Sequence, residues 1–180
     1  MKRLTLLRHA KSDWDDPVAR DFDRPLNRRG EKAARLMGDY AARQGMAFDL
    51  LVASPAVRVV QTLETFFAGY GRTLDARWDR RIYLAASPTL MDVVRDLPDS
   101  ANNVLMAGHN PGLEELILDL VPDDGASPLR EDVEVKFPTA SLAVLDLAVD
   151  RWEDARDNVA TLARFTRPRD LDPALGPESR

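Results

Sequence analysis

Two histidines and two arginines are the residues of this chain whose types and positions best suit chemistry. Arg8 and His9 follow a short apolar run at the start of the chain, and His109, the second of only two histidines, follows another. Arg58 lies near the start of a predicted helix. A guanidinium offers a planar fork of donors to phosphate oxygens, and a neutral imidazole nitrogen can attack phosphorus. Each residue alone has an ordinary interpretation, a hydrogen-bonded histidine or a solvated arginine, so their mutual position matters.

Short apolar runs predict the strands that position these side chains. The runs at 4–7, 50–53 and 104–107 are too short for helices and are bounded by turn-forming residues, which is typical of buried strands. Helical patterns follow each of them, and two closing strands are predicted at 142–148 and 160–165. This alternation indicates an α/β fold with a parallel-type sheet. The carboxyl ends of parallel strands meet at one edge, so Arg8, His9, Arg58 and His109 should converge there.

Composition limits the remaining possibilities. A length of 180 residues fits one domain, predicted at 1–165, with a poorly ordered tail at 166–180. The net charge of −5 argues against nucleic acid or an anionic membrane as the main partner. An acidic rim is expected around the site, which would suit a basic or neutral protein surface. The sequence has no cysteine, which excludes thiol nucleophiles and zinc–thiolate sites. No stretch approaches the length of a membrane span, so a cytoplasmic protein is expected.

Three segments carry a resemblance to a known family. They are Leu-Leu-Arg8-His9-Ala-Lys-Ser12, Ser54-Pro55-x-x-Arg58-x-x-Gln61-Thr62 and Gly108-His109-Asn110-Pro111-Gly112. In this order they resemble the signature segments of the histidine phosphatase superfamily, also called phosphoglycerate mutase-like. The short length and the segment Asp23-Arg24-Pro25-Leu26-Asn27 are most similar to its SixA-type phosphohistidine phosphatases.

The resemblance implies a three-layer α/β/α fold with a mostly parallel central sheet and a role for each of the four residues. His9 would be the nucleophile that takes the phosphoryl group, and water would then hydrolyse the phosphohistidine. Arg8 and Arg58 would hold the phosphoryl oxygens, and His109 would donate to them. Phosphoryl transfer depends mainly on positioning and positive charge, so neither a metal ion nor a cofactor is expected.

Two departures from the wider family bear on the substrate. Mutase-type members have a glutamate acid after the third strand, whereas the segment 82–91 contains no carboxylate. Imidazole leaves with little proton donation, unlike an alkoxide, so this difference favours a phosphohistidine substrate in a protein. Asp15 falls where mutase-type members place an asparagine. Asp15, Asp21 and Asp23 are therefore candidates for a substitute acid.

Other interpretations stay open at this level. The substrate could be a small phosphorylated molecule, as for a phosphomonoesterase or mutase, or the chain could be a non-catalytic module that binds phosphate or a phosphoprotein. A metal site is disfavoured because the arginines would repel the ion. Lys11, Ser12 and Ser141 are candidate pocket residues without an assigned role. The acidic segment 121–138 is expected to cover or border the site.

Overall fold

The computed structural model describes residues 1–18 and 20–177, and its core is one six-stranded sheet. The strands are β1 (Lys2–Arg8), β2 (Leu50–Ala53), β3 (Ala76–Trp78), β4 (Asn103–Gly108), β5 (Leu142–Leu147) and β6 (Ala160–Thr166). The helices are α1 (Arg28–Arg43), α2 (Val57–Tyr70), α3 (Ser87–Arg95), α4 (Gly112–Leu120), α5 (Pro128–Val135) and α6 (Pro168–Leu171).

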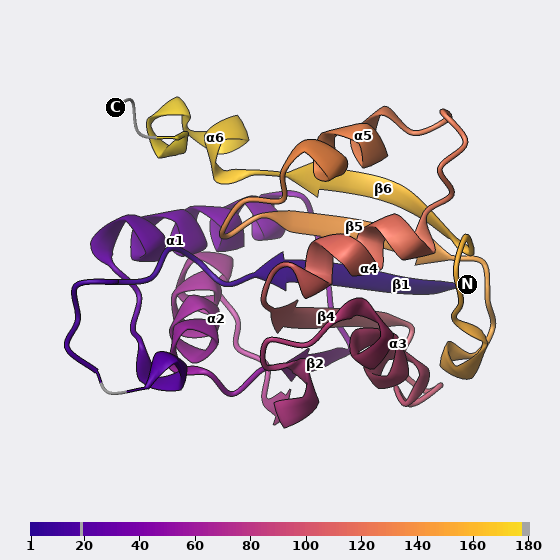
Figure 1. The fold of residues 1–180 in the computed structure, drawn as a ribbon, viewed down its shortest axis with the longest axis horizontal. Helices are drawn as coiled ribbons and strands as arrows, with labels where there is room; N and C mark the ends of the chain where they lie inside the picture. The colour runs from indigo at the N-terminus through magenta and orange to yellow at the C-terminus, as the bar shows by residue number, and fades with distance from the viewer. Residues whose placement is uncertain (19, 178–180) are drawn as a thin grey trace.

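The order of the strands is β3-β2-β4-β1-β5-β6. The first four strands are parallel, and β5 runs antiparallel to both β1 and β6. Figure 1 shows α3, α4 and α5 in front of the sheet, with α1 and α2 behind it. The predicted three-layer α/β fold with a mostly parallel sheet is confirmed, and each short apolar run forms its predicted strand.

The alternation of side chains along the strands divides the core between the two faces. Leu4 and Leu6 of β1 pack with α3 and α4, whereas Leu7 packs with α1 and α2. All three are fully buried. The runs are apolar at consecutive positions because helices cover both faces, as expected for parallel strands.

The N-terminus of α1 is packed directly on the chain that leaves β1. The Asn27 side chain caps this helix by accepting a hydrogen bond from the Gly30 N–H at 2.8 Å. A Cβ at Gly30 would overlap the backbone carbonyl of Lys11, so only glycine permits this approach. The contact fixes the loop that begins at His9 against α1.

The end of the chain differs from expectation. A poorly ordered tail was predicted at 166–180. Instead, Thr166 ends β6, and the segment after it contains α6 and a 3-10 turn at Pro173–Leu175. Residues 178–180 lie outside the described part. Leu175 packs against the small cluster between α1 and the loop after β1, and Lys32 of α1 pairs with Asp172 at 3.4 Å. A few apolar residues anchor a segment whose polar composition suggested disorder.

The acidic segment 121–138 contains α5, whose N-terminus is capped by Ser127. Arg130 is buried and donates hydrogen bonds to the carbonyls of Val121 and Leu118, each at 3.0 Å. These bonds attach α5 to the end of α4. No helix in the described residues is long and apolar enough to cross a membrane.

Candidate active site

The four residues singled out by the sequence converge at the carboxyl ends of neighbouring strands. Strand β4 lies between β1 and β2, so His9, which follows β1, is adjacent to His109, which follows β4. The centroids of the two imidazole rings are 5.3 Å apart, and their planes are tilted by 57°. Arg58 is buried in the first turn of α2, where its charge acts on both rings.

His9 is held as a neutral ring with one free nitrogen. Its Nδ1 lies 2.7 Å from the Ala10 carbonyl, which can only accept a hydrogen bond, so the proton is on Nδ1 and Nε2 keeps its lone pair. Burial lowers the pKa of His9 to about 3, and the positive charges of Arg8 and Arg58 act in the same direction. At neutral pH His9 therefore presents an unprotonated Nε2, as a nucleophile requires.

His109 is oriented by Ser54, a residue without a role in the sequence analysis. The Ser54 hydroxyl oxygen accepts the Ala56 N–H at 3.3 Å and lies 2.8 Å from His109 Nε2. This arrangement favours donation of the hydroxyl proton to Nε2, which leaves the imidazole proton on Nδ1. Burial also lowers the pKa of His109 to about 3, with Arg58 as the next cause, so the neutral ring is a hydrogen-bond donor at Nδ1.

A third arginine joins the two that were predicted. Arg24 is buried, donates to the Ser12 hydroxyl, and places its guanidinium carbon 3.5 Å from the centroid of the Trp14 ring. Arg8 donates through Nη1 to the Phe137 carbonyl at 2.9 Å. The only sequence signal for Arg24 was its place just before the cap of α1, within a segment typical of SixA-type proteins.

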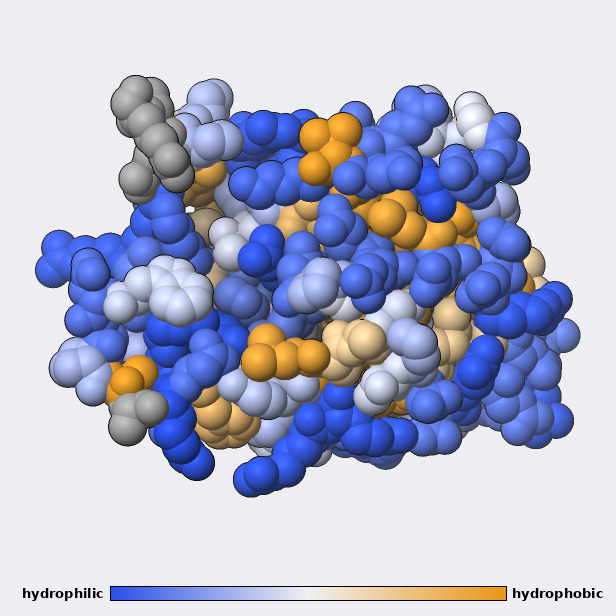
Figure 2. Space-filling view, viewed as in Figure 1, coloured by the Kyte–Doolittle hydropathy of each residue, from blue (hydrophilic) through white to orange (hydrophobic). Residues whose placement is uncertain are grey.

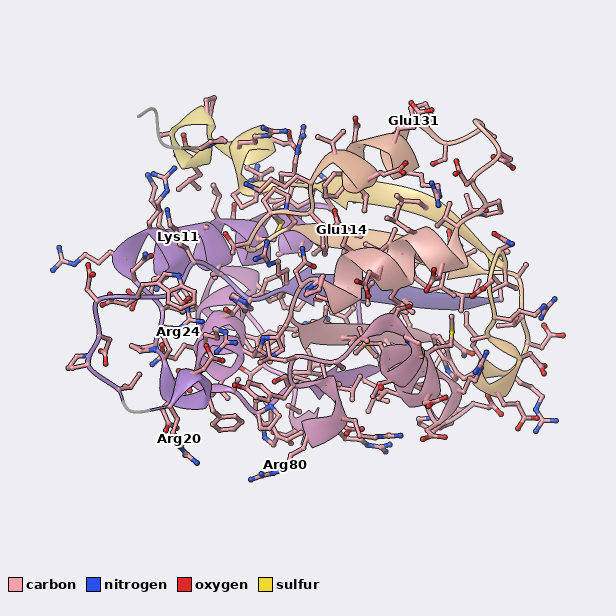
Figure 3. The ribbon with its side chains drawn as sticks, viewed as in Figure 1. Lys11, Arg20, Arg24, Arg80, Glu114 and Glu131 are labelled. Atoms are coloured by element: carbon pink, nitrogen blue, oxygen red, sulfur yellow. The ribbon has the colours of Figure 1, made fainter. Side chains whose placement is uncertain are left out.

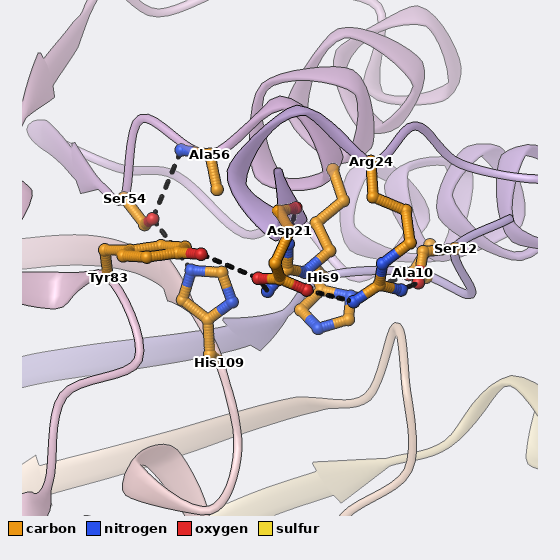
Figure 4. A network of polar contacts seen from close by, with 10 residues as sticks. His9, Ala10, Ser12, Asp21, Arg24, Ser54, Ala56, Tyr83 and His109 are labelled. Carbon is orange, nitrogen blue, oxygen red and sulfur yellow. Dashed lines mark hydrogen bonds and ion pairs between the residues drawn. The ribbon is translucent and has the colours of Figure 1, made fainter. Parts of the chain in front are cut away.

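The Asp21 carboxylate lies between two of the guanidinium groups (Figure 4). It accepts hydrogen bonds from Arg58 at 2.9 Å, from Arg24 at 2.8 Å and from the Tyr83 hydroxyl at 2.6 Å. Partial burial would raise the pKa of Asp21, but the bonds from Tyr83, Arg24 and Arg58 together hold it well below its usual range. Asp21 is therefore ionised at neutral pH and carries no proton to donate in this state. The segment 82–91 supplies Tyr83 to this network in place of a carboxylate.

Buried polar atoms without a partner are concentrated at this site. Among the described residues, six buried side-chain nitrogen or oxygen atoms have no hydrogen-bond partner. Five of these six atoms are Arg8 Nε, Arg24 Nε, Arg58 Nε, His109 Nδ1 and Ser141 Oγ. Burying a donor without an acceptor is costly, so the arrangement suits a ligand that accepts several hydrogen bonds, such as a tetrahedral oxyanion.

Of the remaining candidate residues, two line the cavity in front of His9 and two lie outside its described lining. Lys11 and Ser12 line the same cavity as His9, and Figure 3 shows Lys11 and Arg24 at the same end of the molecule. Asp23 is bound to the exposed Arg20. Asp15 is exposed in the loop and does not belong to the described lining of the cavity.

Comparison with known proteins agrees with this geometry. The family model of the histidine phosphatase superfamily (branch 1) matches residues 4–82. An uncharacterized protein of Mycobacterium tuberculosis, Rv1276c, is 35% identical over 164 residues, which cover 91% of this chain and 100% of that protein. The chain belongs to the histidine phosphatase superfamily.

Solved structures of this superfamily have the same fold. The protein assigned as phosphohistidine phosphatase SixA of Agrobacterium tumefaciens has a TM-score of 0.77 and 31% identity, covering 93% of this chain and 98% of that chain. The corresponding protein of Nakamurella multipartitia has a TM-score of 0.80 and 28% identity, covering 93% of this chain and 96% of that chain. A tungstate complex of the protein histidine phosphatase SixA has a TM-score of 0.77 at 22% identity, which shows the fold alone, and covers 94% of this chain and 99% of that chain.

The position of Asp21 predicts that its carboxylate competes with anions for Arg58 and Arg24. Asp21→Asn removes a negative charge from Arg58 and Arg24, so inorganic phosphate should bind roughly tenfold more tightly, equivalent to about 1.4 kcal/mol. Isothermal titration calorimetry with inorganic phosphate measures the dissociation constant of each protein. Asp23→Asn, which alters only the surface pair with Arg20, is the matched control and should bind phosphate like the native protein. Weaker phosphate binding by Asp21→Asn would contradict the competition.

The burial of His109 predicts a pH-dependent stability. The unfolded chain binds a proton on this residue near pH 6.5, whereas the folded chain does so only near pH 3. The contribution of His109 to the free energy of unfolding is therefore complete above the unfolded pKa and falls as the pH drops toward the folded pKa. His109→Asn lacks this loss. Its free energy of unfolding, relative to that of the native protein, should therefore rise by about 1.4 kcal/mol for each unit by which the pH is lowered from about pH 6 to about pH 4.

Denaturant unfolding at a series of pH values tests this prediction. Ser54→Ala serves as the control because it removes the hydrogen bond to His109 but leaves the titrating ring in place. Its stability difference from the native protein should change much less with pH. A difference between His109→Asn and the native protein that is constant over this range would show that His109 titrates normally in the folded chain.

Proposed function

We propose that this protein is a phosphohistidine phosphatase that acts on a phosphoprotein through a covalent phosphohistidine intermediate on His9, without a metal ion. The observation that carries the proposal is the convergence of a neutral, free Nε2 of His9 with His109 and three guanidinium groups. These groups supply a nucleophile and several donors for one phosphoryl group. Arg8, Arg58 and His109 keep the roles predicted from the sequence, and Arg24 joins them.

The first step would transfer the phosphoryl group from the substrate to His9. A bond forms between phosphorus and His9 Nε2 while the bond between phosphorus and the substrate imidazole breaks. The electron pair of the broken bond stays on the substrate nitrogen, and the substrate histidine leaves as a neutral imidazole because its other ring nitrogen already carries a proton. The guanidinium groups hold the phosphoryl oxygens so that His9 Nε2, phosphorus and the substrate nitrogen lie in one line. His109 Nδ1–H donates a hydrogen bond to one of the phosphoryl oxygens. Charge on the oxygens is thereby stabilised in a site that is largely shielded from water.

The second step would return His9 to its starting state. Water attacks phosphorus, the bond to His9 Nε2 breaks, and inorganic phosphate leaves with the oxygen of the water. The hydrogen bond from His9 Nδ1 to the Ala10 carbonyl keeps Nε2 directed at phosphorus in both steps. The same hydrogen bond disfavours attachment of the phosphoryl group to Nδ1.

The electrostatics of Asp21 favour a phosphorus–nitrogen bond as the one that is cleaved. An alkoxide leaving group needs an acid, but the carboxyl group nearest the arginines is ionised and bound to three donors. A phosphohistidine whose second ring nitrogen carries a proton instead releases a neutral imidazole. The conjugate acid of that imidazole has a pKa of about 6.5, so no further acid is needed. The similarity to proteins assigned as phosphohistidine phosphatases supports the same substrate class.

Comparing substrates in the native protein and in His9→Ala tests the proposal. The native protein should hydrolyse a phosphohistidine peptide faster than phosphoserine or an aryl phosphate, and its activity should survive chelation of metal ions. Acid-labile, base-stable phosphate should become attached to the protein during turnover. His9→Ala should lose at least about 10³-fold in kcat and form no phosphoenzyme, because the nucleophile is absent.

Three results would contradict the proposal in different ways. Activity of His9→Ala close to that of the native protein would exclude the covalent route. Faster hydrolysis of a sugar phosphate than of phosphohistidine would favour a small-molecule phosphatase of the same superfamily. Tight phosphate binding with no turnover on any substrate would indicate a binding module.

A further inference from the structure

The cavity in front of His9 is bordered by positive charge, although the chain as a whole is acidic. Its volume is about 550 Å³, much more than a phosphoryl group occupies. Asp21 is the one carboxylate among its described lining residues. The basic lining residues are Arg8, Lys11, Arg24, Arg29, Arg58, Lys136, Arg167 and Arg169. The expectation of an acidic rim is therefore wrong.

Several separate segments bring the outer cations to this cavity. Lys11 follows β1, Arg29 belongs to the first turn of α1, and Lys136 follows α5. Arg167 and Arg169 come from the segment after β6. Such a distribution surrounds the mouth of the cavity with positive charge, beyond the three arginines that face the phosphoryl position.

The segment after β6 is a fixed wall of the cavity. Arg29 donates a hydrogen bond to the Gly176 carbonyl, and Pro168 is buried. Arg167 is held by a two-point ion pair with Asp170, with distances of 2.9 and 3.0 Å. Arg169, in the same short helix, is exposed and lines the cavity. The fold thus presents Arg169 at a defined position on the rim.

Exposed apolar side chains accompany these cations. Trp14 is 76% exposed and Leu84 is 54% exposed, and both line the cavity. Most of the surrounding surface is hydrophilic in Figure 2. His9, in contrast, is only 8% exposed. Exposed tryptophan and arginine side chains around a recessed reactive group are typical of a protein-binding surface.

We propose that the mouth of this cavity docks an acidic protein surface that carries the phosphohistidine. Lys136 and Arg169 would contact carboxylates beside the phosphorylated residue, and Trp14 and Leu84 would pack against its apolar neighbours. Charge complementarity of this kind increases the rate of association and selects among partners. The proposal rests on the proposed function, because it names the class of phosphoprotein for the same site.

Two phosphohistidine peptides that differ only in their flanking residues, acidic or neutral, test the docking surface. The native protein should have the lower KM for the acidic peptide, and added salt should remove this preference. The double variant Lys136→Glu, Arg169→Glu should raise the KM for the acidic peptide by roughly tenfold or more without changing kcat. Its KM for the neutral peptide should change little.

Arg77→Glu is the matched control. Arg77 is exposed in β3, at the opposite edge of the sheet from β6, and the variant changes the net charge by the same amount per site. It should behave as the native protein does with both peptides. An equal KM for the acidic and neutral peptides in the native protein, or an equal effect of Arg77→Glu, would overturn the docking proposal.

A binding measurement separates this proposal from the proposed function. If neither peptide is hydrolysed, the proposed function fails, but fluorescence anisotropy of the two labelled peptides with His9→Ala still reports on docking. Tighter binding of the acidic peptide, lost when Lys136→Glu and Arg169→Glu are added, would support the surface. Equal binding of both peptides would refute it.

Discussion

The burial of positive charge beside two neutral imidazoles is the constraint on which this site depends. Arg24 and Arg58 are almost fully removed from solvent, and Arg8 is half-buried beside them. Such charges are costly to bury without a counter-charge. The Asp21 carboxylate meets part of this requirement by binding Arg24 and Arg58 at once. The Nε–H groups of Arg8, Arg24 and Arg58 have no acceptor in the described part of the chain.

The same electrostatics explain why the histidines stay neutral. An imidazolium among several guanidinium groups would be repelled, and burial removes the water that would stabilise it. The low pKa values of His9 and His109 follow from these two causes, burial first. Neutral His9 keeps a lone pair on Nε2 and neutral His109 keeps a proton on Nδ1, so burial and the surrounding positive charge set the protonation state of both rings.

The sequence predicted the residues that follow the strands but not those held by tertiary contacts. Arg8, His9 and His109 lie directly at the ends of apolar runs, so their convergence follows from the geometry of a parallel sheet. Arg24 comes from a long polar loop, and no periodicity indicates which of its side chains turns inward. Asp21, in the same loop, was a candidate acid on equal terms with Asp15 and Asp23, and only its tertiary contacts distinguish it. Tyr83 was not predicted because the segment 82–91 was considered only for a carboxylate.

The end of the chain and the rim of the cavity show where composition misleads. The polar residues after β6 suggested disorder, but Leu175 packs against the cluster beside α1 and Pro168 is buried. An acidic rim was expected, yet the fold gathers basic residues from distant segments around one cavity. Local charge depends on which segments meet, and only the tertiary structure shows this.

The position of the phosphoryl group on the trapped phosphoenzyme decides whether His9 is the nucleophile. Nuclear magnetic resonance of protein labelled with ¹⁵N-histidine, recorded through ³¹P–¹⁵N coupling, identifies both the residue and the nitrogen that carry phosphorus. We expect phosphorus on His9 Nε2, because the Ala10 carbonyl engages Nδ1. Phosphorus on His109, or on Nδ1 of His9, would contradict this expectation.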